Sequence, residues 1–179
     1  FNFSMAASVG TLIFTAFAVA ADTPLLGKAL DLVAGASVVW ALAATANFLL
    51  TYLNVAGIEI KFDQSFGESL WMFATEIEMG TALALNAAAA VLLSVLALAV
   101  RSLTASAMLA ALGIAAIVPL ALIGHAAGTA NHAMAVNSIG LHLVAVTIWV
   151  GGLVALVVSR DADAERQANL VKRFSTLAL

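Results

Sequence analysis

Three histidines and a few methionines are the side chains in this sequence best suited to hold a soft metal ion. His125, His132 and His142 lie in one short stretch, and Met134 lies between the last two. Imidazole and thioether groups suit copper, Cu(I) especially, whereas hard cations prefer carboxylate oxygens. The chain has no cysteine, which excludes disulfides and metal–thiolate sites. This stretch therefore predicts a copper site, for either Cu(I) or Cu(II).

A second group of possible ligands lies earlier in the chain. Met72, Glu76 and Met79 are spaced at i, i+4 and i+7, which places them on one stripe if a single helix carries them. They then converge on an ion without any backbone rearrangement. We predict that this stripe assists the histidines.

The composition indicates which structural elements carry these histidines and methionines. Of 179 residues, 64% are apolar and only 9% are charged, and the mean hydropathy is +1.10. A water-soluble domain has about 25% charged residues, so this chain requires lipid as its solvent. Its apolar runs are long enough to cross about 30 Å of hydrocarbon, and strict alternation is absent. Since lipid leaves backbone groups unsatisfied, the runs must be helices.

We therefore predict an all-α, polytopic transmembrane bundle of about five full spans plus the start of a sixth. Span four carries Pro119, which removes the helical donor to the carbonyl of Ala115. We expect residues 1–179 to form one domain, cut from a longer protein at both ends. The predicted spans are Phe3–Ala21, Ala29–Leu53, Leu70–Val100, Leu103–Gly124 and Asn137–Ser159, with a charged loop, Arg160 to Arg173, before a sixth that begins at Phe174.

The basic residues orient this bundle. With the N-terminus outside, only Lys61 lies on the outer side, and the positive-inside rule strongly favours that arrangement. It places the histidines, Met72, Met79 and Met134 at or near the outer face. The net charge of −3 and the lack of a basic stripe argue against nucleic acid as a partner. The basic residues assigned to the inner side are Lys28, Arg101, Arg160, Arg166, Lys172 and Arg173.

One stretch of the sequence resembles a known family. The segment Gly124–His132, the pairs Asn137-Ser138 and Leu141-His142, and the run Trp149–Leu153 are similar to the signature of the CopD copper-resistance membrane domain. The closest resemblance is to actinobacterial proteins in which that domain precedes a CtaG-like cytochrome c oxidase assembly domain. The resemblance implies a multi-pass protein of the bacterial inner membrane that transports copper or confers copper resistance.

The same resemblance implies possible partners. These are an extracytoplasmic copper binder of the CopC type, a CtaG-like domain and cytochrome c oxidase. Such proteins would carry copper at His125, His132 and His142.

Two other functions remain open from the residues alone. His125 and His142 could ligate a b-type haem between spans four and five. The bundle could instead be a metal-free structural part of a larger complex. An enzyme is not expected, since the sequence has no nucleophile–base pair, phosphate loop or HExxH motif.

Overall fold

The computed structural model describes residues 1–19, 24–57, 63–123, 132–160 and 162–178, and the side chains of 122 and 132–135 are outside that description. The described part is entirely helical, as predicted, and contains no strand. Its helices are α1 (Asn2–Ala18), α2 (Pro24–Ala56), α3 (Gln64–Glu76), α4 (Glu78–Ala99), α5 (Leu103–Leu122), α6 (His132–Val158) and α7 (Ala164–Ala178).

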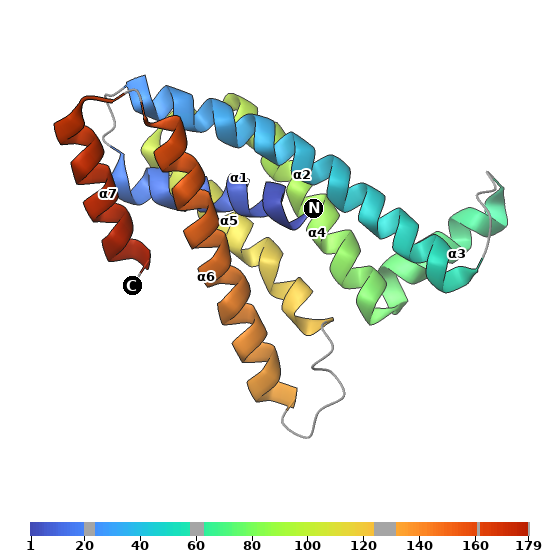
Figure 1. Ribbon diagram of the computed structural model, residues 1–179. Helices are drawn as coiled ribbons and strands as arrows, with labels where there is room; N and C mark the ends of the chain where they lie inside the picture. The colour runs from blue at the N-terminus through green and yellow to red at the C-terminus, as the bar shows by residue number, and fades with distance from the viewer. Residues whose placement is uncertain (20–23, 58–62, 124–131, 161, 179) are drawn as a thin grey trace.

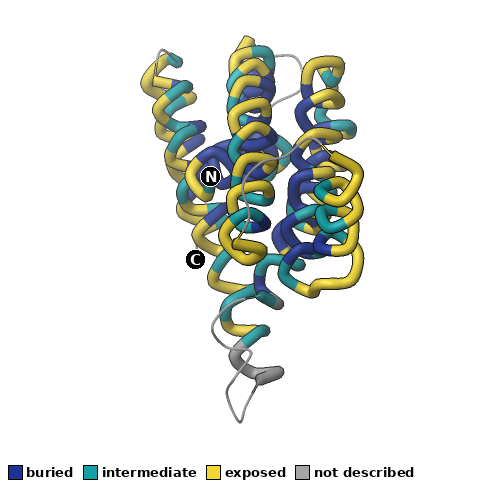
Figure 2. The backbone as a smooth tube through the Cα atoms, turned by 90° about the vertical axis from the view of Figure 1, so that its right-hand side faces the viewer, coloured by how far each residue is buried: buried dark blue, intermediate teal, exposed yellow. Residues whose placement is uncertain are grey.

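Four of these helices, α2, α4, α5 and α6, are long and apolar enough to cross a membrane, and α1 is a shorter apolar helix. Large apolar side chains remain exposed along their outer faces, for example Leu42, Val95 and Val157. Figure 2 shows exposed and buried positions alternating around the helices, with the buried ones turned inward. Since water would not tolerate such a surface, the protein is a multi-pass membrane protein.

Helix α1 forms the centre of the bundle. It is buried over most of its surface, and it contacts α2, α5, α6 and α7 (Figure 1). Its interior side chains include Ser4, Ser8, Thr11 and Thr15 as well as apolar residues. In lipid these hydroxyls would be costly, so the surrounding helices shield them.

Glycines allow α1 and α6 to approach closely. A Cβ added to Gly10 would overlap the carbonyl oxygen of Thr147 and lie 2.7 Å from the Cα of Gly151. At the same crossing, the hydroxyl of Thr11 donates to the carbonyl of Gly151 at 3.3 Å. Small residues commonly permit such backbone contact between membrane helices.

The second large interface joins α2, α4 and α5. Trp40 of α2 is fully buried in the apolar core. Asn86 of α4 donates through Nδ2 to the carbonyl of Ala116 on α5 at 2.8 Å. Such hydrogen bonds are a common role of amide side chains between membrane helices. The bond lies one residue from Ala115, whose carbonyl loses its helical donor to Pro119.

The predicted third span is wrong at its start. A single helix from Leu70 was expected, but the chain breaks at Ile77, which has extended backbone angles (φ −97°, ψ 118°). The break separates α3 from α4. At the turn a Cβ on Gly80 would overlap the carbonyl oxygen of Phe73, so the two helices fold closely together there.

Aromatic side chains hold α3 against the end of α2. Tyr52 lies 5.4 Å from Phe66 and 5.5 Å from Phe73 between ring centroids, and Phe48 lies 5.7 Å from Phe73. Asp63 caps the first turn of α3 by accepting a hydrogen bond from the amide of Phe66 at 2.8 Å. The apolar pattern across Ile77 favours one continuous helix. Packing of α3 against the aromatic rings of α2 favours the break instead, and the structure shows the break.

The predicted charged loop before a sixth span is also wrong in part. Helix α7 begins at Ala164, so Arg166, Lys172 and Arg173 are helical, and Phe174 lies inside the helix. Its apolar face packs on α1 and α6: the Phe174 ring lies 6.2 Å from that of Phe14 and against Gly152.

Candidate functional site

The predicted ligands divide among three places in the fold. Met72 and Glu76 are exposed on α3, and Met79 is half-buried in the first turn of α4. His132 and Met134 lie in the first turn of α6, with side chains outside the described part, and His142 is exposed further along α6. His125 lies outside the described residues.

The Met72, Glu76 and Met79 stripe is interrupted. Glu76 is the last residue of α3 and Met79 belongs to α4, with the break at Ile77 between them. The i, i+4, i+7 spacing therefore does not place the three on one helical face. Figure 1 also shows α3 and the first turns of α6 at separate corners of the molecule. The structure therefore does not bring the Met72 group to the start of α6, where His132 lies.

Two of the histidines share one continuous helix. The sequence placed His132 in a loop and His142 early in a span, but α6 contains both. About ten residues, or about 15 Å of helix axis at 1.5 Å per residue, separate them. A metal ion lies only about 2 Å from each imidazole nitrogen, and the rings extend only a few bonds from their Cα atoms. His132 and His142 therefore cannot bind one ion together while α6 is intact.

His142 lies on a face of α6 that no described helix covers. Its neighbours on that face include Leu141 and Trp149, which are 73% and 54% exposed. An ionisable side chain within a membrane span is costly and is commonly functional. His142 thus remains a candidate ligand, but as a position separate from His132.

A pocket of about 300 Å³ lies between α5 and α6, in the halves of these helices nearest His132 in sequence. Apolar side chains, among them Ile117 and Val144, line most of it, and Asn137 and Gly140 complete one wall. Within the described ranges, no cluster of three or more His, Asp or Glu side chains is placed to hold a metal.

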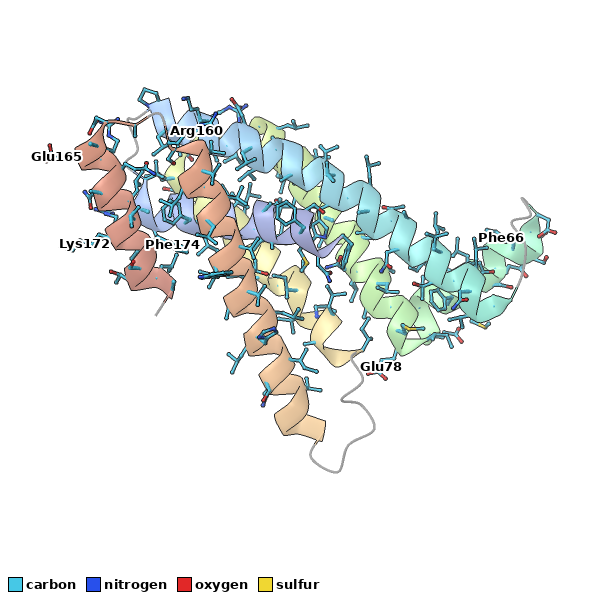
Figure 3. All side chains as sticks on the ribbon, viewed as in Figure 1. Phe66, Glu78, Arg160, Glu165, Lys172 and Phe174 are labelled. Carbon is cyan, nitrogen blue, oxygen red and sulfur yellow. The ribbon has the colours of Figure 1, made fainter. Side chains whose placement is uncertain are left out.

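The basic residues assigned to the inner side gather at the opposite end. Arg101 lies 3.2 Å from Asp31 between Nη2 and Oδ1, which joins the start of α5 to the start of α2. Lys28 and Arg166 line one pocket. In Figure 3, Arg160, Glu165 and Lys172 lie at this end, whereas Phe66 lies at the far end. The side of the membrane that this end faces stays a prediction.

Comparison with known proteins identifies the family. A family model described as the copper resistance protein D-like N-terminal domain matches residues 1–135. The match includes His125 and His132 and ends before His142, so it falls largely on the segment where the sequence resemblance was least specific. No curated protein matches the chain, and no solved structure does.

Proposed function

Because the chain belongs to the copper resistance protein D-like family, we propose that it binds copper at the extracytoplasmic face of the bacterial inner membrane. From there it would pass the ion inward or to a partner. The observation that carries this proposal is the family match over residues 1–135, which contains two of the three histidines. The absence of cysteine supports it further, since imidazole and thioether are the soft ligands that remain.

The helix geometry divides the proposed ligands into separate positions. We propose that His132 and Met134, in the first turn of α6, belong to an entry position together with His125, which lies outside the described residues. His142 forms a second position about 15 Å further along the helix axis. Met72, Glu76 and Met79 form a third group at the junction of α3 and α4. A protein with separate weak positions is suited to passing an ion onward, because no single site holds it too tightly.

We also propose, from the family resemblance, that the protein handles copper without catalysing a reaction. The same resemblance suggests its partners. An extracytoplasmic copper binder of the CopC type would deliver or receive the ion. A CtaG-like domain and cytochrome c oxidase would be the destination if the copper serves oxidase assembly.

Copper content of purified protein tests the proposal. We expect wild-type protein in lipid nanodiscs to bind copper in equilibrium dialysis, measured by elemental analysis of the two chambers. The double variant His125→Ala, His132→Ala should lose the entry position, and His142→Ala should lose a separate fraction. Ser138→Ala is the matched control, because Ser138 is exposed on α6, does not line the pocket between α5 and α6, and is not a soft ligand. Acidification should release copper, since only neutral imidazole binds a metal.

Two results would contradict the proposal. Unchanged copper content in the variant that lacks all three histidines would exclude imidazole ligation. A Soret absorbance band in wild-type protein, lost on replacing His142, would instead favour a b-type haem.

A further inference from the structure

A second candidate site lies at the opposite end of the bundle from the histidines. A pocket of about 240 Å³ opens there between α1, α2 and α7. Ala18, Val19 and Leu25 form its wall on α1 and α2, and α7 supplies Arg166 and Arg173. Two guanidinium groups therefore face an apolar wall.

The charge around this pocket is unbalanced in favour of cations. None of the carboxylates that the structure describes lines it. Arg173 donates through Nη1 to the carbonyl of Phe17 at 3.1 Å, which uses one of its five N–H groups and fixes the side chain. Arg166 has a weaker partner, because its Nε lies 3.9 Å from a carboxylate oxygen of Asp163. The side chains of Arg166 and Asp163 are 49% and 64% exposed.

A neighbouring pocket extends the same surface. It has a volume of about 260 Å³, and Leu25 and Arg166 line both pockets. Lys28 and Asp163 line only the second. Among the described residues that line the two pockets, three are cationic and one is a carboxylate. Planar guanidinium groups bind phosphate oxygens in pairs, so this arrangement suits a phosphate group.

The apolar wall distinguishes an amphiphile from a soluble anion. Leu170 of α7 continues the apolar wall formed by Ala18, Val19 and Leu25. These side chains gain nothing from inorganic phosphate, but they would contact the glycerol and upper acyl chain of a lipid. The pocket also lies at the basic end of the bundle, which the positive-inside rule assigns to the inner leaflet.

We propose that this pocket between α1, α2 and α7 binds an anionic phospholipid of the inner leaflet, with the lipid phosphate on Arg166 and Arg173. The bound lipid attaches α7 to the membrane at the point where Arg173 already joins it to α1. Clusters of basic side chains on amphipathic helices commonly recognise anionic lipids in this way.

Native mass spectrometry of the detergent-solubilised protein tests the inference, with phosphatidylglycerol or phosphatidylcholine added in a titration. We expect wild-type protein to retain phosphatidylglycerol preferentially. Arg166→Gln should weaken that retention about tenfold, the effect of losing one charge-assisted contact. Lys172→Gln is the matched control, because it removes the same charge from an exposed position on the same helix without lining the pocket.

Arg166→Gln avoids the structural contact of Arg173 with Phe17, and an unchanged circular dichroism spectrum would show that the variant is folded. Equal retention in Arg166→Gln and Lys172→Gln would overturn the inference, because only general attraction to charge would remain. Displacement of the lipid by millimolar inorganic phosphate would overturn it as well, since the site would then recognise a soluble anion. Copper content should be the same in both variants, so this test is independent of the histidines.

Discussion

The crossing of α1 and α6 gives the sharpest test of the packing. Replacing Gly10 with alanine adds one methyl group at a point where the two backbones already touch. That methyl would overlap the carbonyl oxygen of Thr147 and lie 2.7 Å from the Cα of Gly151. Ordinary carbon contacts begin near 3.4 Å, so the helices must separate by at least about 0.7 Å, the shortfall from carbon–carbon van der Waals distance.

This separation has two costs. Overpacking of a well-packed core typically costs about 1–3 kcal/mol. The hydrogen bond from Thr11 to Gly151 is already 3.3 Å long and would break, which adds about 0.6 kcal/mol, the average for hydrogen bonds between membrane helices. We therefore expect Gly10→Ala to destabilise the bundle by about 2–4 kcal/mol, the sum of these two contributions.

Unfolding in mixed detergent micelles, followed by circular dichroism, measures this change. Gly35→Ala is the matched control: Gly35 lies in α2, and a Cβ there would meet nothing within 4 Å. The control should be neutral or slightly stabilising, because alanine is the better helix former. Equal stability of Gly10→Ala and Gly35→Ala would refute the close approach of α1 to α6.

Three further changes test other contacts. Gly152→Ala would place a methyl group 2.5 Å from the Phe174 ring, so α7 should detach and become more sensitive to protease in nanodiscs. Asn86→Leu should lower stability by about 0.6–1.7 kcal/mol through loss of its bond to α5, measured by the same detergent titration. Asp63→Ala should fray the start of α3. The pKa of the Asp63 carboxyl is held below its ordinary value, chiefly by the hydrogen bond from the Phe66 amide. Its stabilisation is thus present at neutral pH and lost as pH falls through the lowered pKa. The protection factor of the Phe66 amide, which is its intrinsic exchange rate divided by its observed rate at the same pH, should accordingly fall in acid in wild type but be low at every pH in Asp63→Ala.

The long apolar runs predicted the helices well, because each run must satisfy its own backbone in lipid. The break at Ile77 was not predicted, since neither glycine nor proline stands at Ile77 itself and Gly80, at the turn, lies three residues further on. It depends on contacts distant in sequence, in which Tyr52 of α2 packs against the rings of α3. The early start of α7 was missed for a related reason. Its charged residues were assigned to a loop, although their spacing leaves Leu170 and Phe174 on one buried face.

The candidate copper site was predictable only in its residue types. Spacing along the sequence identified the histidines and methionines but not the lengths of the helices that carry them. Extension of α6 back to His132 separates two of the ligands by about 15 Å of helix axis. The break between α3 and α4 likewise separates Glu76 from Met79. A one-turn change in a helix end is small for a fold but decisive for a metal site.

The central position of α1 has a consequence for how the protein is made. Helix α1 is fully surrounded only when α6 packs against it. The hydrogen bond from Thr11 to the carbonyl of Gly151 joins residues that are 140 positions apart in the chain. During synthesis, α1 leaves the ribosome long before α6 exists, so its hydroxyl-bearing faces have no protein to cover them. A temporary host, such as the insertion machinery or a chaperone, would have to hold α1 at the edge of the bilayer until the later helices surround it.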